Sequence, residues 1–195
     1  MKFKTLAAAA FALALAASPS HAAGSTSFGI NVGVNLPTGD FGDIASLGYF
    51  GGVTGTMMIN DQFGIGGDIN FHSFGVNNDY EEALAVLAGE SVDVSWSAIQ
   101  VTPHAKFLFS KGGDFIPYAR VGLGIYNTKF KIETATSGDS EESSSDFGYN
   151  LGIGGMKKLG DKMAMGVELL YHSISSEGES ANLFTVGGVL NFGGN

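Results

Sequence analysis

The stretch "LFTVGGVLNFGGN", residues 183–195, shows most clearly the pattern that recurs along this chain. Apolar side chains stand at every second position between Phe184 and Phe192, and glycine occupies position 188 in the same series. Alternation with a period of two is the signal of a β-strand with one apolar face. Such a face needs a cover, which is either another layer of protein or lipid.

Seven further segments repeat this alternation. They are residues 28–37, 49–60, 63–72, 96–109, 115–128, 147–157 and 162–172. Short turns at about 60–61, 110–114 and 159–161 alternate with long loops at 37–48, 75–93, 132–146 and 174–182. Eight strands joined in this way predict an antiparallel up-and-down sheet. Because the number of strands is even, both termini of the chain are expected at the short-turn end of the sheet.

Residues 1–22 have the order of a secretory signal peptide. Lys2 and Lys4 precede an unbroken apolar run from Leu6 to Ala17, and Ser20-His21-Ala22 places small residues where a signal peptidase reads them. The run is too short to span a bilayer. The sequence therefore predicts an exported protein with a cleaved signal at 1–22 and a single domain at 23–195.

Composition limits the class of protein. Glycine accounts for 30 of 195 residues, cysteine is absent, and the formal net charge of −9 becomes −11 without Lys2 and Lys4. An exported chain without cysteine has no disulfide framework. An acidic chain lacks the basic surface that nucleic-acid binding requires, so no nucleic-acid partner is expected. After the signal, no apolar run approaches the roughly 20 residues of a membrane helix, so a membrane crossing would have to use strands.

The two faces of the predicted strands favour a membrane barrel. The second face consists mainly of glycine and asparagine with single charges, rather than the lysines and glutamates that solvate an outer surface. Aromatic residues gather near strand ends on the apolar face, as in lipid-facing strands with two aromatic girdles. A sheet in lipid must close, because open edges leave backbone groups without hydrogen bonds. The fold expected is an eight-stranded antiparallel transmembrane β-barrel; a soluble exported barrel is the alternative.

The chain resembles small outer-membrane β-barrels of the OmpA/OmpX type. The residues that carry the resemblance are "GINVGVNLPTGDFGD" at 29–43, "FIPYARVGLG" at 115–124 and the last strand. The resemblance implies a monomer in the outer membrane of a Gram-negative-type bacterium, in contact with membrane lipid and lipopolysaccharide. It also implies a C-terminal signal for the barrel-assembly machinery, formed by Thr185, Gly187, Leu190 and Phe192. Gly193-Gly194-Asn195 follow the aromatic residue that usually ends the chain in this family.

The long loops are acidic. They contain fourteen carboxylates and neither lysine nor arginine. The acidic residues are Asp40, Asp43, Asp79, Glu81, Glu82, Glu90, Asp93, Glu133, Asp139, Glu141, Glu142, Asp146, Glu177 and Glu179, whereas Lys111, Lys157, Lys158 and Lys162 lie at the short turns. By the family's topology the long loops face outward, where they form a solvated acidic surface. The alternative, collection of divalent cations that bridge to lipopolysaccharide, has no calcium-loop spacing to support it, so no metal site or cofactor is expected.

Four charged residues share the predicted lumen: Asp68, Lys106, Arg120 and Glu168. A charge inside a narrow barrel is costly unless it is paired. We expect Asp68 to pair with Lys106 on the adjacent strand and Arg120 to reach Glu168, which together would plug the lumen. The alternative is a small, intermittent ion path.

His72 and His172 are also expected in the upper lumen, and "YHSISS" at 171–176 suggests a lipid hydrolase. Because adjacent strand residues point to opposite faces, His172 and Ser173 do not form the pair that a nucleophile needs.

Residues 81–89 are expected to form a short helical turn. The leading hypothesis is a non-enzymatic envelope protein with acidic outer loops, followed by a narrow porin-like channel and then by a lipid-modifying enzyme.

Overall fold

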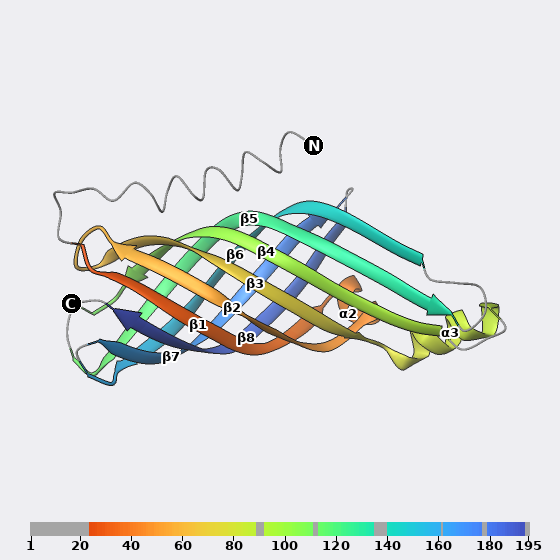
Figure 1. Ribbon diagram of the computed structural model, residues 1–195, viewed down its shortest axis with the longest axis horizontal. Helices are drawn as coiled ribbons and strands as arrows, with labels where there is room; N and C mark the ends of the chain where they lie inside the picture. Colours follow the sequence, from red (N-terminus) through yellow and green to blue (C-terminus); the bar gives the residue numbers. More distant parts are fainter. Residues whose placement is uncertain are drawn as a thin grey trace.

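The computed structural model describes residues 24–88, 92–110, 113–134, 140–160, 162–176 and 179–193. The predicted signal peptide at 1–22 lies outside the described residues. Eight antiparallel strands form one closed barrel in sequence order (Figure 1). The strands are β1 (Thr26–Thr38), β2 (Ala45–Met58), β3 (Phe63–Val76), β4 (Val92–Leu108), β5 (Phe115–Thr134), β6 (Ser140–Lys158), β7 (Met163–Ser176) and β8 (Glu179–Gly193). The predicted fold is confirmed.

The barrel closes where β1 meets β8. Their pairing runs from Ser27 opposite Gly193 to Thr38 opposite Asn182, so the two strands are joined along almost their whole length. The start of β1 and the end of β8 lie together at the short-turn end, as the even strand number predicts (Figure 1). Closure removes the open edge that lipid would not tolerate.

The strands turn their apolar faces outward and their polar faces inward, which is the reverse of the arrangement in a soluble protein. In β8, Phe184 is 37% exposed on the outside, whereas the next residue, Thr185, is only 2% exposed and faces the interior. The same alternation exposes large apolar residues on every strand, and the buried interior is mainly polar. This arrangement suits a barrel whose outside meets lipid. No helix in the described part of the chain is long and apolar enough to cross a membrane.

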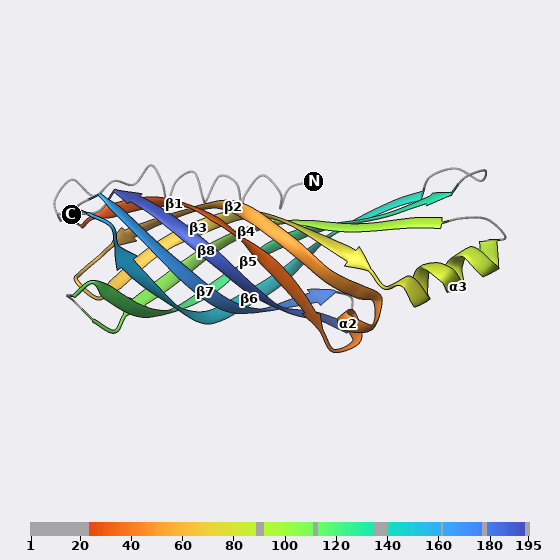
Figure 2. The same cartoon turned by 90° about the horizontal axis from the view of Figure 1, so that it is seen from below.

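The strands at the long-loop end are longer than predicted. The segments 132–146 and 174–182, which were expected as loops, are mostly strand: β5 and β6 stay paired up to Ile132 opposite Ser140, and β7 and β8 up to Ser176 opposite Glu179. Figure 2 shows the ends of β4, β5 and β6 projecting beyond the other strands. These strands can carry polar residues typical of loops because backbone hydrogen bonds hold the ladder, and these bonds do not depend on the polarity of the side chain.

Two helices occupy the other long connections. Helix α2 (Asp40–Ile44) joins β1 to β2, and α3 (Asn78–Ala88) joins β3 to β4. Helix α3 is longer than the turn predicted at 81–89, and it lies at the projecting end of the molecule (Figure 2).

The excess of glycine is explained by close packing in a narrow interior. A Cβ atom on Gly52 would lie 2.2 Å from Oδ1 of Asn70, and one on Gly154 would lie 2.4 Å from Cζ of Tyr118. By contrast, a Cβ atom on the outward-facing Gly51 would meet its nearest atom at 3.7 Å. An eight-stranded barrel is just wide enough for side chains to fill it. Inward glycines therefore make room for polar and aromatic side chains from the neighbouring strand.

Candidate functional site

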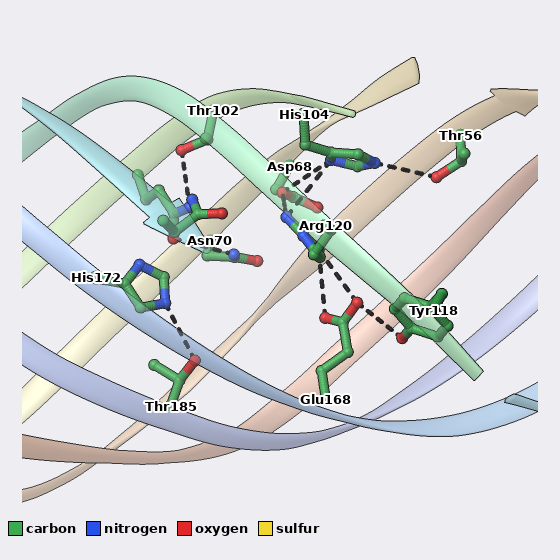
Figure 3. A network of polar contacts seen from close by, with 12 residues as sticks. Thr56, Asp68, Asn70, Thr102, His104, Tyr118, Arg120, Glu168, His172 and Thr185 are labelled. Atoms are coloured by element: carbon green, nitrogen blue, oxygen red, sulfur yellow. Dashed lines mark hydrogen bonds and ion pairs between the residues drawn. The ribbon is translucent and has the colours of Figure 1, made fainter. Parts of the chain in front are cut away.

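The predicted charged cluster lies in the barrel interior, and Arg120 is at its centre. Arg120 forms an ion pair with Asp68, and its Nη1 lies 3.3 Å from Oε2 of Glu168. The hydroxyl of Tyr118 donates a hydrogen bond of 2.8 Å to Oε1 of Glu168. Figure 3 shows the guanidinium between the two carboxylates, which come from strands on different sides of the lumen. One cation therefore joins β3, β5 and β7 across the interior.

The expected pair between Asp68 and Lys106 is wrong, because Asp68 pairs with Arg120 instead. Nζ of Lys106 lies 4.5 Å from the centroid of the Tyr118 ring, in a cation–π arrangement. Asp68 is in register with Thr102, four residues from Lys106 on the same strand, which is a separation of about 13 Å along β4. To reach Asp68, Lys106 on the adjacent strand would have to extend along the barrel wall. Arg120 lies on β5, two strands away from β3, and its side chain crosses the lumen. Its two terminal nitrogens also serve both carboxylates, which a single ammonium does less well.

His104 completes the cluster and was not among the predicted site residues. Its Nδ1 lies 3.1 Å from Oδ2 of Asp68, and its Nε2 lies 3.2 Å from the Thr56 hydroxyl (Figure 3). The alternation of inward and outward positions along the strand could have identified it, because His104 is two residues from Lys106 and therefore on the same inward face. Gly66 is opposite His104 in register and leaves room for the imidazole.

A layer of amides and imidazoles lies beside the charged cluster. His72 contacts Oδ1 of Asn35 at 3.1 Å through Nδ1 and Oε1 of Gln100 at 2.8 Å through Nε2. His172 contacts the Tyr126 hydroxyl at 2.9 Å and the Thr185 hydroxyl at 3.1 Å. Both histidines are buried and their ring centroids are 5.9 Å apart. Their expected place in the lumen agrees with the structure.

An apolar cluster lies at the long-loop end of the interior. Phe41 of α2 is buried, with its ring centroid 5.3 Å from that of Phe74 and 4.7 Å from that of Trp96. Ile174 and Leu183 belong to the same cluster. We call Phe41, Phe74, Trp96, Ile174 and Leu183 the apolar cap. Helix α2 thus contributes one buried aromatic side chain, Phe41, to this cluster.

The predicted assembly segment forms part of β8. Thr185 and Gly187 face the lumen, and Phe192 is exposed on the outside. Gly193 has a φ of 86° and its N–H donates a hydrogen bond of 2.9 Å to the carbonyl of Lys162. A φ in this range favours glycine, which suits Gly193 to the last position of β8. Residues 194–195 lie outside the described part of the chain.

The geometry around His172 does not resemble a hydrolase. Its two ring nitrogens contact Tyr126 and Thr185, and Ser173 lies on the opposite face of β7. Within the described residues, no three histidine, cysteine or carboxylate side chains are grouped to hold a metal ion. What the lumen can do chemically is to hold charges in fixed positions.

Comparison with known protein families identifies the chain. A family model described as "Outer membrane protein beta-barrel domain" matches residues 7–192. The chain belongs to this family. It is thus an outer-membrane β-barrel of the small type that the sequence resembles. No curated protein sequence matches the chain.

Solved structures show the same fold for other outer-membrane barrels. Ail of Yersinia pestis, solved in complex with the heparin analogue sucrose octasulfate, has 14% identity and a TM-score of 0.60 over 87% of this chain and 99% of that one. Neisserial surface protein A has 12% identity and a TM-score of 0.53 over 86% and 96%. OprG of Pseudomonas aeruginosa has 15% identity and a TM-score of 0.52 over 87% and 97%. At these identities the similarity concerns the fold alone.

The central place of Arg120 leads to a stability prediction. Arg120→Met leaves Asp68 and Glu168 buried without their cation, so we expect the free energy of unfolding to fall by about 3–5 kcal/mol. Lys106→Met removes the cation–π contact with Tyr118 and a more distant attraction to Glu168, and its expected loss is below about 2 kcal/mol. Urea unfolding in detergent micelles, followed by the fluorescence of Trp96, measures both variants.

A triple variant controls this comparison. Arg120→Met combined with Asp68→Asn and Glu168→Gln removes the three charges together and should recover part of the loss, because no carboxylate is stranded. Equal losses for Arg120→Met and Lys106→Met would contradict the central role of Arg120.

Proposed function

We propose that this chain is a non-enzymatic, envelope-structural outer-membrane protein, closed to solutes, which presents an acidic extension for interactions at the cell surface. The observation that carries the proposal is the filling of the lumen. The side chains of Asp68, Arg120 and Glu168 meet across it, and each is at most 7% exposed. A solute would have to break these ion pairs to pass.

The barrier has more than one layer. Between the charged cluster and the long-loop end lie the buried His72 and His172, and beyond them the apolar cap. Each layer uses a different interaction: ion pairs, neutral hydrogen bonds and apolar contact. Opening a path for ions requires all three layers to rearrange, which supports a structural role over transport.

A narrow channel is the second candidate, and buried polar atoms favour it. Oδ1 of Asp68 and Nε of Arg120 make no hydrogen bond with any residue that the structure describes. Buried polar atoms in proteins are usually satisfied by protein groups or by ordered water. Water in the lumen would be the first requirement for an ion path.

The outward surface is the part that would meet a partner. Glu141 and Glu142 of β6 are exposed on the projecting strands. The strand extension also brings Lys129 close to Glu141, at 2.8 Å, and Lys131 into an ion pair with Glu133. The acidic surface is therefore partly neutralised at the projecting end, which the predicted loop at 132–146 did not indicate. The carboxylates Asp40, Asp43 and Glu82 are exposed and Glu81 is half-buried, and none of the four forms an ion pair with a described residue.

Helix α3 adds an apolar contact point to this acidic surface. Val86 and Leu87 are 82% and 84% exposed, so they do not pack on the barrel. Exposed apolar residues rimmed by charge are typical of protein interaction sites. A partner with basic and apolar groups fits this surface better than the sulfated sugar bound in the Ail structure, because carboxylates repel a polyanion.

Lipopolysaccharide is the expected neighbour in the membrane, and Thr185, Gly187, Leu190 and Phe192 are the proposed signal to the barrel-assembly machinery.

Planar-bilayer recordings test whether the barrel is closed. Wild-type protein and the Glu168→Ala variant should both lack steady conductance steps, because the apolar cap remains when one carboxylate is removed. Steps in the wild type would contradict the proposal and favour the channel. Steps in Glu168→Ala alone would show that the charged cluster is the whole barrier, which would contradict the layered seal.

Cysteine labelling tests which end of the barrel faces outward. The chain has no cysteine, so Glu142→Cys on the projecting strands and Asp114→Cys at a short turn each give a single reactive site. With a bulky maleimide that does not cross the membrane, intact cells should label Glu142→Cys only. Asp114→Cys should react only after the outer membrane is permeabilised, and the reverse pattern would overturn the proposed orientation.

A further inference from the structure

Three exposed lysines lie together at the short-turn end of the barrel. Lys157 and Lys158 end β6, and Lys162 immediately precedes β7. The hairpin 157–162 contains three lysines and one aspartate. We call Lys157, Lys158 and Lys162 the basic turn.

The lysines of the basic turn have no acidic partner among the described residues. This distinguishes them from Lys129 and Lys131 at the opposite end, which pair with Glu141 and Glu133. Asp114, just before β5, accepts a hydrogen bond of 3.1 Å at its backbone carbonyl from the backbone N–H of Lys158. Its carboxylate makes no ion pair with a lysine of the basic turn. The cations of this turn are therefore available to an external anion.

The basic turn stands at the edge of the lipid-facing surface. Lys157 is in register with Phe115 on one side and with Met165 on the other. Phe115 is 60% exposed, and Leu159 within the turn is exposed as well. Aromatic residues at the ends of barrel strands mark the boundary between hydrocarbon and headgroups. Lysines beside such residues extend their ammonium groups to headgroup depth.

We propose that the basic turn binds the phosphate groups of anionic phospholipids in the leaflet at the short-turn end. The lipid's acyl chains would lie along the apolar faces of β6 and β7. Its phosphate would meet Lys157 on the outer face, and Lys158 and Lys162 would reach it from the rim of the barrel. Ammonium groups are point-charge donors to phosphate, and basic residues beside a membrane are attracted to anionic lipid. Because the other end of the barrel is acidic, the same lipid would find no equivalent site there. The site depends only on the barrel spanning a bilayer, and it is independent of the proposed surface function.

Spin-labelled lipids test the proposal on the full chain in vesicles. The association of spin-labelled phosphatidylglycerol at the protein surface is measured relative to spin-labelled phosphatidylcholine. Wild-type protein should prefer phosphatidylglycerol, and the preference should fall several-fold in the variant Lys157→Gln, Lys158→Gln, Lys162→Gln. Raising the salt concentration should reduce the preference of the wild type, because salt screens exposed charges.

The matched control is Lys129→Gln with Lys131→Gln, which removes two lysines from the acidic end and should leave the preference unchanged. Gel mobility with and without heating confirms that each variant is a folded barrel. An unchanged preference in the basic-turn variant would overturn the proposal, and so would an equal loss in the control, because the effect would then be one of total charge. Competition by millimolar inorganic phosphate would also overturn it, because the site would then recognise free phosphate rather than a lipid.

Discussion

Backbone N–H and carbonyl groups that face lipid must all find hydrogen-bond partners within the protein, and the architecture of this barrel follows from that requirement. Lipid offers no partner for an open strand edge, so β1 must pair with β8, and it does so from Ser27 to Thr38. Closing only eight strands makes the interior narrow. A narrow interior in turn requires glycines such as Gly52 and Gly154, because a Cβ atom at these positions would collide with side chains of neighbouring strands.

The same constraint places charge inside the barrel. Lipid covers the outer face, so the polar side chains of each strand face the lumen and need partners there. Arg120 meets this need for Asp68 and Glu168 together. The hydrogen-bonded histidines fill the next layer, and Phe41 covers the long-loop end with apolar surface. The interior is therefore filled in layers of decreasing charge toward that end.

Much of this arrangement follows from the sequence, because a period of two is a local signal. The alternation in residues 183–192 predicted the lumen position of Thr185 and the exposure of Phe184, and the strand number predicted where both ends meet. The contact between Arg120 and Glu168 was also expected, because both residues occupy inward-facing positions at a similar distance from their short turns. What could not be predicted depends on three dimensions. Arg120 on β5 reaches Asp68 on β3 because the curvature of the barrel brings non-adjacent strands together. His104 is on β4, between these two strands, and its inward parity could have indicated its place beside Asp68. The strand extension around Lys131 was missed because its polar side chains resemble those of a loop, although the backbone ladder continues.

Disulfide formation across the closing pair of strands tests the barrel most directly. Val34 and Val186 are partners in the ladder between β1 and β8, whereas Leu190 lies four residues away on the same face. Ladder partners have Cα atoms about 4.5–5.5 Å apart, within reach of a disulfide, and an offset of four residues adds about 13 Å. In a chain without cysteine, Val34→Cys with Val186→Cys should form an intramolecular bond on oxidation, and Val34→Cys with Leu190→Cys should not. Crosslinking of the offset pair, or crosslinks only between molecules, would contradict a barrel closed in this register.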